Sequence, residues 1–136
     1  MKRLPLATAL FAALAFASLH AQTIDMNAKV PFDFRMGETL MPAGEYVIHH
    51  AAGLVALRGQ NGVHAAAMNL TLPASRKDAP TKGALEFNRY GDSYFLAKIW
   101  APDSRDGRAL IRTKREKELA SRVALTQTAT LALTSK

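Results

Sequence analysis

The chain has 136 residues, with 18 Lys and Arg against 11 Asp and Glu and a formal net charge of +7 at pH 7. It contains no cysteine, which excludes disulfides, a lipid-modified cysteine and a cysteine nucleophile. The positive charge suits an anionic partner such as lipid headgroups, acidic polysaccharide or nucleic acid, although solubility alone also explains a charge that is spread along the chain.

Residues 1–21 have the composition of a secretory signal peptide. Lys2 and Arg3 precede an apolar run over residues 4–19, and Ala21 supplies the small residue that cleavage needs. We expect the mature chain to begin at Gln22, with residues 17–18 as an alternative cleavage site. The protein is therefore predicted to be exported, to the periplasm or outside the cell.

Residues 22–136 form one predicted domain. It carries 16 Lys and Arg against 11 Asp and Glu, a net charge of +5, and is large enough to bury a core without disulfides. We expect no membrane-spanning segment after cleavage. A retained membrane anchor is the alternative, but residues 4–19 are shorter than the ~20 residues of a spanning helix.

The domain begins with alternating apolar residues that predict a long strand over residues 23–34. Pro31 within this segment marks a bend or an edge position. The sequence MPAG at residues 41–44 is typical of a turn with Pro at its second position, and a strand over residues 45–50 follows it.

A predicted meander follows, with its strongest turn signal at Asn61 and Gly62, which both tolerate the positive φ of a type I′ turn. Counting outward from a two-residue loop places Leu57 opposite Ala66. One face of the meander then collects Tyr46, Ile48, Val55, Leu57, Ala66, Met68 and Leu70.

Residues 72–83 are polar, contain two prolines and end in glycine. This composition predicts a loop, and we expect it to be the most mobile loop of the chain.

Residues 84–100 predict the central β-hairpin, with its turn at Gly91 and Asp92. A three-residue loop that sets Tyr90 opposite Tyr94 satisfies cross-strand pairing throughout, because it matches charge with charge and apolar with apolar residues. The residues expected to face the core are Leu85, Phe87, Phe95, Ala97 and Ile99. Those expected on the opposite face, under partial cover from another element, are Tyr94, Leu96 and Trp100.

Thr113 and Glu116 form a capping box that predicts a short helix over residues 114–121, with Leu119 and Ala120 as the residues that dock. Residues 123–133 then alternate aliphatic residues with Thr and Ala, which predicts a long, late strand that belongs to the sheet.

Four pieces of the sequence together resemble a family of small exported bacterial β proteins of uncharacterised function. They are VPFDF (30–34), MPAGEY (41–46), RYGDSYFLAKIW (89–100) and GRALIRTKREKELA (107–120). The resemblance implies an exported small β domain and assigns no activity or site residues. The piece PAGEY is also similar to the turn and strand of prealbumin-like β-sandwich modules.

The sequence predicts no catalytic residue, no metal ligand and no cofactor. A metal site would need two histidines that converge on one ion. His49 and His50 are adjacent, so a regular strand would point them to opposite faces, and they could not both bind one metal ion. Asp103 and Asp106 resemble a calcium loop only loosely, because the other ligand positions are missing. Sequence motifs of serine hydrolases, zinc proteases, phosphate-binding loops and dinucleotide-binding domains are absent.

One basic concentration stands out near the end of the chain, formed by Arg105, Arg108, Arg112, Lys114, Arg115, Lys117 and Arg122. Aromatic residues close to it in sequence could stack nucleic-acid bases. The candidate binding residues are therefore Arg105, Arg108, Arg112, Arg115, Tyr94 and Trp100. Interleaved Asp and Glu residues favour the simpler interpretation of a solvated helix face.

The sequence as a whole predicts an all-β domain: an antiparallel β-sandwich or partly closed barrel of seven or eight strands, with one short helix near the C-terminus. The expected function is non-catalytic binding or assembly at the cell envelope, with an envelope component or an anionic polymer as partner. A secreted hydrolase is the first alternative. A binder of anionic polymers or surfaces through residues 105–122 is the second.

Overall fold

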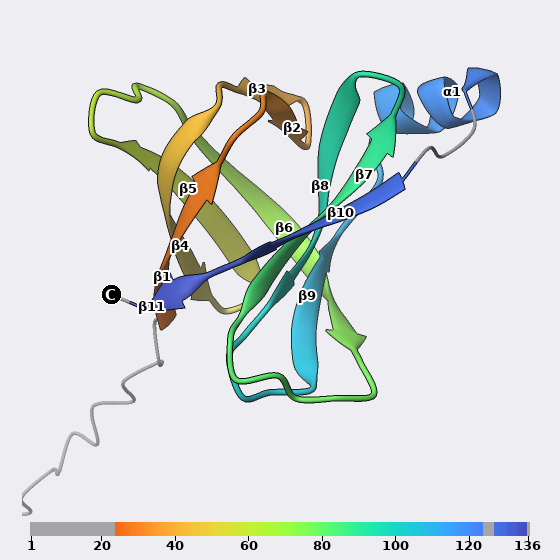
Figure 1. Ribbon diagram of the computed structural model, residues 1–136. Helices are drawn as coiled ribbons and strands as arrows, with labels where there is room; N and C mark the ends of the chain where they lie inside the picture. Colours follow the sequence, from red (N-terminus) through yellow and green to blue (C-terminus); the bar gives the residue numbers. More distant parts are fainter. Residues whose placement is uncertain (1–23, 124–126, 136) are drawn as a thin grey trace, which may run out of the picture.

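The computed structural model describes residues 24–123 and 127–135, and within these ranges it contains eleven strands and one helix (Figure 1). The elements are β1 (Ile24–Val30), β2 (Phe34–Met36), β3 (Thr39–Met41), β4 (Gly44–Ala51), β5 (Leu54–Gln60), β6 (Ala66–Ser75), β7 (Ala84–Tyr90), β8 (Ser93–Trp100), β9 (Asp106–Leu110), α1 (Lys114–Arg122), β10 (Gln127–Ala132) and β11 (Thr134–Ser135). The predicted all-β fold with one short helix near the C-terminus is confirmed. The strands outnumber the predicted seven or eight because several are short pieces of longer extended segments.

The strands form two sheets that share β6 (Figure 1). The N-terminal sheet contains β1, β4, β5 and residues 66–70 of β6, which pair with β5. The C-terminal sheet contains β7 to β10 and residues 71–75 of β6, which pair with β9. Neighbours are antiparallel except for β2 against β8.

The C-terminal segment joins the two sheets a second time. Strand β10 pairs with β7, and β11 pairs with β1, so the strand order begins and ends with neighbouring parts of the same segment. Between them Leu133 is buried in the core, and its N–H donates to the Gly83 carbonyl at 2.9 Å. The late strand is therefore confirmed over β10 as an integral part of the sheet; residues 124–126 lie outside the described residues.

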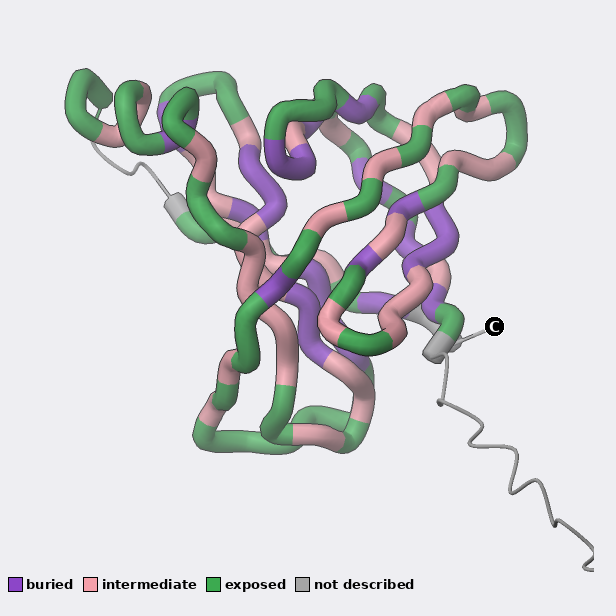
Figure 2. Tube along the Cα trace, turned by 180° about the vertical axis from the view of Figure 1, so that it is seen from behind, coloured by how far each residue is buried: buried purple, intermediate pink, exposed green. Residues whose placement is uncertain are grey.

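Side chains from both sheets meet in one core. The buried residues are coloured purple along the chain in Figure 2. The ring of Phe34 lies edge-on to Tyr46 of the N-terminal sheet and to Phe87 of the C-terminal sheet, with centroids 5.5 and 5.3 Å apart. All three residues are less than 2% exposed. This contact packs the two inner faces against each other through aromatic rings, whose edge-to-face geometry is favourable.

Several local predictions are confirmed. Pro31 marks a bend as expected, although the strand predicted over residues 23–34 ends there at Val30, and the turn at residues 42–43 separates β3 from β4. The capping box is formed, because Thr113 Oγ1 accepts a hydrogen bond from Glu116 N at 3.2 Å. The helix docks, however, through Glu116, which is 5% exposed and accepts hydrogen bonds from Asn88 Nδ2 and Tyr90 Oη at 3.2 Å.

The predicted register between β5 and β6 is wrong by one residue. Asn61 and Gly62 do form the turn, with φ of 51° and 88°. The chain then takes one extra residue before β6 begins, so Leu57 pairs with Ala67 and not with Ala66. Since side chains alternate along a strand, this shift turns the predicted core residues Ala66, Met68 and Leu70 to the outer face.

The predicted loop over residues 72–83 is too long. Residues 72–75 continue β6 and pair with β9 up to Ser75 opposite Asp106. Pro73 is tolerated there although it lacks an N–H. The connection to β7 is therefore confined to residues 76–83.

The central hairpin has the predicted strand register only at the end away from its turn. Leu85 pairs with Ile99 and Glu86 with Lys98 as expected, but a bulge after Glu86 shifts the pairing to a two-residue turn, with Tyr90 opposite Ser93. The predictions for Ala97, Tyr94 and Leu96 are consequently wrong, whereas Phe95 is buried as predicted but lies outside the main core cluster. Leu96 joins the core and Tyr94 packs against it, whereas Phe95 lies against Tyr90 on the outer face and Ala97 lines an outer-face pocket.

The junction at Leu133 generates a first prediction. Leu133→Ala should lower the free energy of unfolding by about 2 to 5 kcal/mol, because it removes a buried side chain where the two sheets are joined. Urea denaturation measures the change. The matched control is Leu40→Ala at an exposed position, which should shift stability by about 0.5 kcal/mol or less. Equal effects of the two substitutions would contradict a structural role for this junction.

Candidate functional site

A cavity of about 370 Å³ lies between the two sheets, at the end of the molecule where β4 and β8 end and β9 begins. Most of its wall is apolar, and the polar groups are concentrated on the side of β9. The residues that line it are Met26, His50, Pro73, Ala74, Ile99, Ala101, Ser104, Asp106, Gly107 and Arg108.

Arg108 is the cation of this cavity, and β6 fixes its side chain. Its register partner on β6 is Pro73, and the guanidinium reaches back to Thr71. Nε donates to Thr71 Oγ1 at 2.8 Å, and Nη2 donates to the Thr71 carbonyl at 2.7 Å. Thr71 is itself buried and donates to the Gly53 carbonyl at 2.7 Å. The guanidinium has five N–H donors, so several remain for a ligand.

No carboxylate neutralises Arg108 within the described residues. The ion pairs found there join Asp25 with His49, Arg89 with Asp92, and Arg115 with Glu38. Asp106 lines the same cavity but lies beyond ion-pair distance of the guanidinium. The cavity therefore presents a half-buried positive charge beside an apolar wall.

His50 faces the same cavity from the end of β4. Burial lowers the pKa of its imidazole, and the neighbouring Arg108 cation lowers it further. The ring is consequently neutral at pH 7, where it can donate one hydrogen bond and accept another. Arg108 is thus the group that carries positive charge in the cavity.

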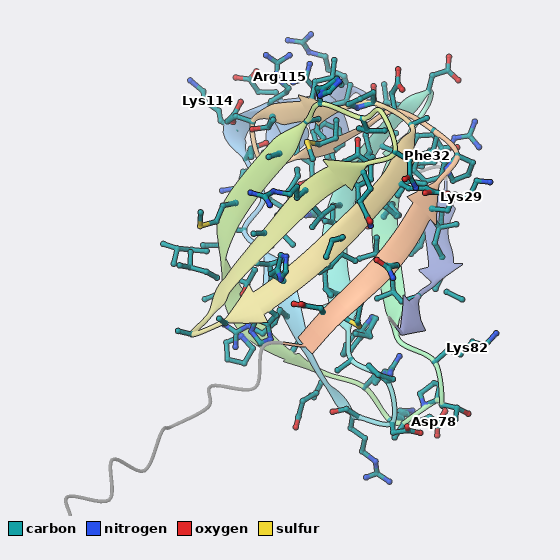
Figure 3. All side chains as sticks on the ribbon, turned by 90° about the vertical axis from the view of Figure 1, so that its left-hand side faces the viewer. Lys29, Phe32, Asp78, Lys82, Lys114 and Arg115 are labelled. Atoms are coloured by element: carbon teal, nitrogen blue, oxygen red, sulfur yellow. The ribbon has the colours of Figure 1, made fainter. Side chains whose placement is uncertain are left out.

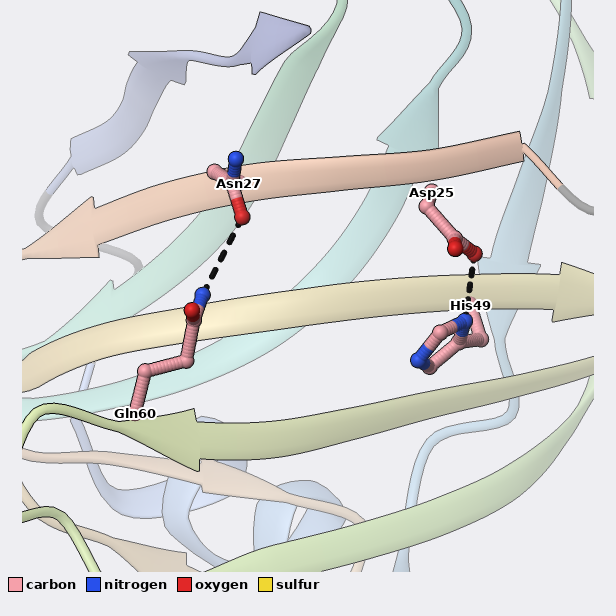
Figure 4. Close-up of polar contacts among 4 residues, drawn as sticks. All are labelled: Asp25, Asn27, His49 and Gln60. Atoms are coloured by element: carbon pink, nitrogen blue, oxygen red, sulfur yellow. Dashed lines mark hydrogen bonds and ion pairs between the residues drawn. The ribbon is translucent and has the colours of Figure 1, made fainter. Parts of the chain in front are cut away.

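The two adjacent histidines point to opposite faces, as the sequence predicts for a strand. His49 lies on the outer face and pairs with Asp25 across β1 and β4 (Figure 4). On the same face Gln60 Nε2 donates to Asn27 Oδ1 at 3.1 Å (Figure 4). Within the described residues, no three His, Asp or Glu side chains are grouped as metal ligands.

Arg76 holds the wall of the cavity that follows β8, a role that the sequence analysis missed. Its Nε donates to the Ser104 carbonyl at 3.1 Å and its Nη2 to the Ala101 carbonyl at 3.0 Å. Its guanidinium lies 5.0 Å from the ring centroid of Trp100. A single arginine in a sequence typical of a loop gave no signal for these contacts.

The six candidate binding residues do not gather at one place. Arg108 lines the cavity, whereas Arg105 precedes β9 and lies at the loop of residues 76–83, since its carbonyl accepts from Arg76 N at 2.9 Å. Arg115 lies at the opposite end of the molecule from that loop, which Asp78 and Lys82 mark (Figure 3). Arg112 lines a separate, polar pocket beside Glu116.

Neither candidate aromatic ring is free to stack on a base. Trp100 is 5% exposed, and its Nε1 donates to Glu86 Oε2 at 3.0 Å. Tyr94 is stacked on Phe32, with the ring centroids 3.8 Å apart. Both rings are engaged by the protein itself, in contrast to the exposed platforms of single-strand binders.

His50 generates a second prediction. Folding lowers the pKa of His50 below 6.5, its ordinary value in an unfolded chain. At a pH between these two pKa values, His50 is protonated in the unfolded chain and neutral in the native state. The free energy of unfolding should therefore fall as the pH drops from 7.5 through 6.5. His50→Gln should make this decline shallower in urea titrations at each pH.

The control for this measurement is His49→Gln, which removes the outer-face imidazole and leaves His50 and the charges around it, Arg108 and Asp106, in place. In the His49→Gln variant, the contribution of His50 to the pH dependence of the free energy of unfolding should be unchanged. Identical slopes for the wild type and His50→Gln would contradict the assignment.

No helix within residues 24–123 and 127–135 is long and apolar enough to cross a membrane. No protein-family model matches the chain. Likewise, no curated protein and no solved structure is significantly similar to it.

Proposed function

We propose that this chain is an exported, non-catalytic binding domain that holds a small amphipathic carboxylate in the cavity between its two sheets. The observation that supports the proposal is Arg108, a half-buried cation that faces an apolar cavity and forms no ion pair within the described residues. A charge removed from water is costly unless it has a partner, and an anionic ligand would supply one.

The chemistry of the wall supports the ligand class. Arginine binds carboxylates through two parallel hydrogen bonds, and Thr71 already holds the guanidinium in place. Met26 and Ile99 offer apolar contact to the remainder of the ligand. Because His50 is neutral at pH 7, a single negative charge matches the cavity better than two.

The size of the cavity supports a small ligand. Its volume of about 370 Å³ lies near the lower end of the range of roughly 300 to 1,000 Å³ for small-molecule sites. A short- or medium-chain fatty acid combines the required size, the carboxylate and the apolar body.

A secreted hydrolase is the second candidate, because the cavity also brings together His50, Ser104 and Asp106, the residue types of a hydrolytic triad. Within the described residues, however, His50 makes no hydrogen bond to either partner, and Ser104 Oγ accepts from Asp106 N at 3.0 Å. Hydrolysis of p-nitrophenyl acetate that Ser104→Ala abolishes would favour the enzyme over the binding domain.

The third prediction tests ligand binding by calorimetric titration with octanoate, octanol and octylamine. Octanoate should bind, and Arg108→Met should weaken its binding about tenfold to a hundredfold, the loss expected for charge-assisted hydrogen bonds of ~1.5 to 3 kcal/mol. Octanol should bind weakly to both proteins, and octylamine should not bind.

Two control variants complete this test. Arg112→Met removes a cation outside the cavity and should leave octanoate binding unchanged, while Arg108→Lys keeps the charge and should bind with intermediate affinity. Thermal melting of each variant checks that the fold is intact. Equal affinities of the wild type and Arg108→Met for octanoate would rule out the assigned site.

The fourth prediction concerns export, which rests on the composition of residues 1–21. Mass spectrometry of the protein recovered from outside the cytoplasm should give an N-terminus near Gln22, because the signal peptide is removed on export. Exported material that retains Met1 would contradict this part of the proposal.

A further inference from the structure

The outer face of β5, β6 and β9 carries a stripe of large, exposed apolar side chains, here called the apolar stripe. Its exposed fractions run from 37% to 67%. The stripe consists of Leu54, Met68, Leu70, Leu72 and Ile111.

The strand register places Leu54 and the three β6 residues on one face, and Ile111 directly follows β9. Leu54 pairs with Leu70, and Leu72 pairs with Ala109 two residues before Ile111. Met68, Leu70 and Leu72 follow at every second position of β6, so they share one side of the sheet. The stripe thus runs along β6, next to Leu54 of β5 and to Ile111, which directly follows β9.

The outer face of β5, β6 and β9 themselves carries little charge, while charged residues lie on the adjacent strands, such as Lys98 of β8 opposite Ala109. The other outward positions on these three strands from residue 54 to residue 109 are alanine or glycine, except for Arg58 and Gln60 on β5. No carboxylate occupies an outward position there. Contiguous exposed apolar surface of this kind marks interaction sites in soluble proteins.

A hollow of about 450 Å³ lies beside the stripe on the same face. Its lining includes Ala56, Ala66, His49, Arg58 and Met68. The same face therefore carries both protruding aliphatic side chains and a shallow recess that has three alanines in its lining. A surface that offers both shapes can pack against a two-fold copy of itself.

We propose that the apolar stripe is the interface of a symmetric dimer, in which Leu70 and Leu72 of each copy pack against the hollow of the other. The five stripe residues alone expose roughly 500 Å² per copy, a large part of the ~800 Å² that each partner buries in a standard interface. The pairing is face to face, because the stripe side chains project from the outer face of the sheets and not from a strand edge.

The dimer is tested by sedimentation velocity on the protein over a range of concentrations. The wild type should be dimeric, and Leu70→Asp should raise the dimer dissociation constant at least about tenfold, because a central apolar residue becomes a charge. Ala56→Trp fills the hollow without adding charge and should have the same effect. Leu40→Asp, at an exposed position of β3, is the matched control and should remain dimeric.

Thermal melting shows whether each variant is folded, so that loss of the dimer is not confused with loss of the fold. A wild type that stays monomeric at high concentration would overturn the proposal. So would a monomer that binds phosphatidylglycerol vesicles through Leu70, since the stripe would then be covered by lipid and not by a second copy.

Discussion

Backbone pairing at the C-terminus holds the two sheets in their relative position. Strand β10 pairs with β7, β11 pairs with β1, and the buried Leu133 lies between them. On the other side of the molecule β6 passes from one sheet into the other. With a junction on each side, the sheets are not free to slide past each other, and the space between them has a defined shape.

The position of Arg108 depends on this arrangement. Arg108 belongs to β9 in the C-terminal sheet, and the Thr71 that holds it lies at the point where β6 changes sheets. His50 approaches from the N-terminal sheet. The cavity is thus built from both sheets, and the cation, the neutral imidazole and the apolar wall meet only because the two junctions bring these strands together.

Local sequence patterns predicted much of this fold, because turns, caps and alternation depend on neighbouring residues. Pro31, the turn at Asn61 and Gly62, and the capping box at Thr113 all act within a few residues. The pairing register of two strands, in contrast, does not depend on neighbouring residues alone. A single extra residue after a turn or a bulge such as the one beyond Glu86 changes every pair that follows, and counting from the turn cannot detect it.

The candidate site was harder to predict than the fold. Arg108 was among the candidate residues, but for its place in a basic run and not for the cavity it lines. His50 was considered only as a metal ligand. Arg76 lay in a segment expected to be mobile. Arg108, His50 and Arg76 lie near one another because β4, β6 and β9 come together at this end of the molecule. The spacing of these residues in the sequence does not predict that arrangement.

The shift between β5 and β6 decides both proposed surfaces at once. In the observed register Thr71 points inward, where it holds Arg108, and Leu70 and Leu72 point outward into the apolar stripe. In the register counted from the turn, these orientations would be exchanged: Thr71 would turn to the outer face, and Leu70 and Leu72 would point inward.

Glycine is the sequence feature that permits the extra residue behind this shift. A Cβ at Gly59 would lie 2.4 Å from the Val63 carbonyl oxygen, and one at Gly44 would lie 2.5 Å from Val63 Cγ2. Val63 can therefore fold back over β4 and β5 only because both positions lack a side chain. Two glycines on neighbouring strands thus set the register of β6, and through it the cavity on one side of the sheet and the apolar stripe on the other.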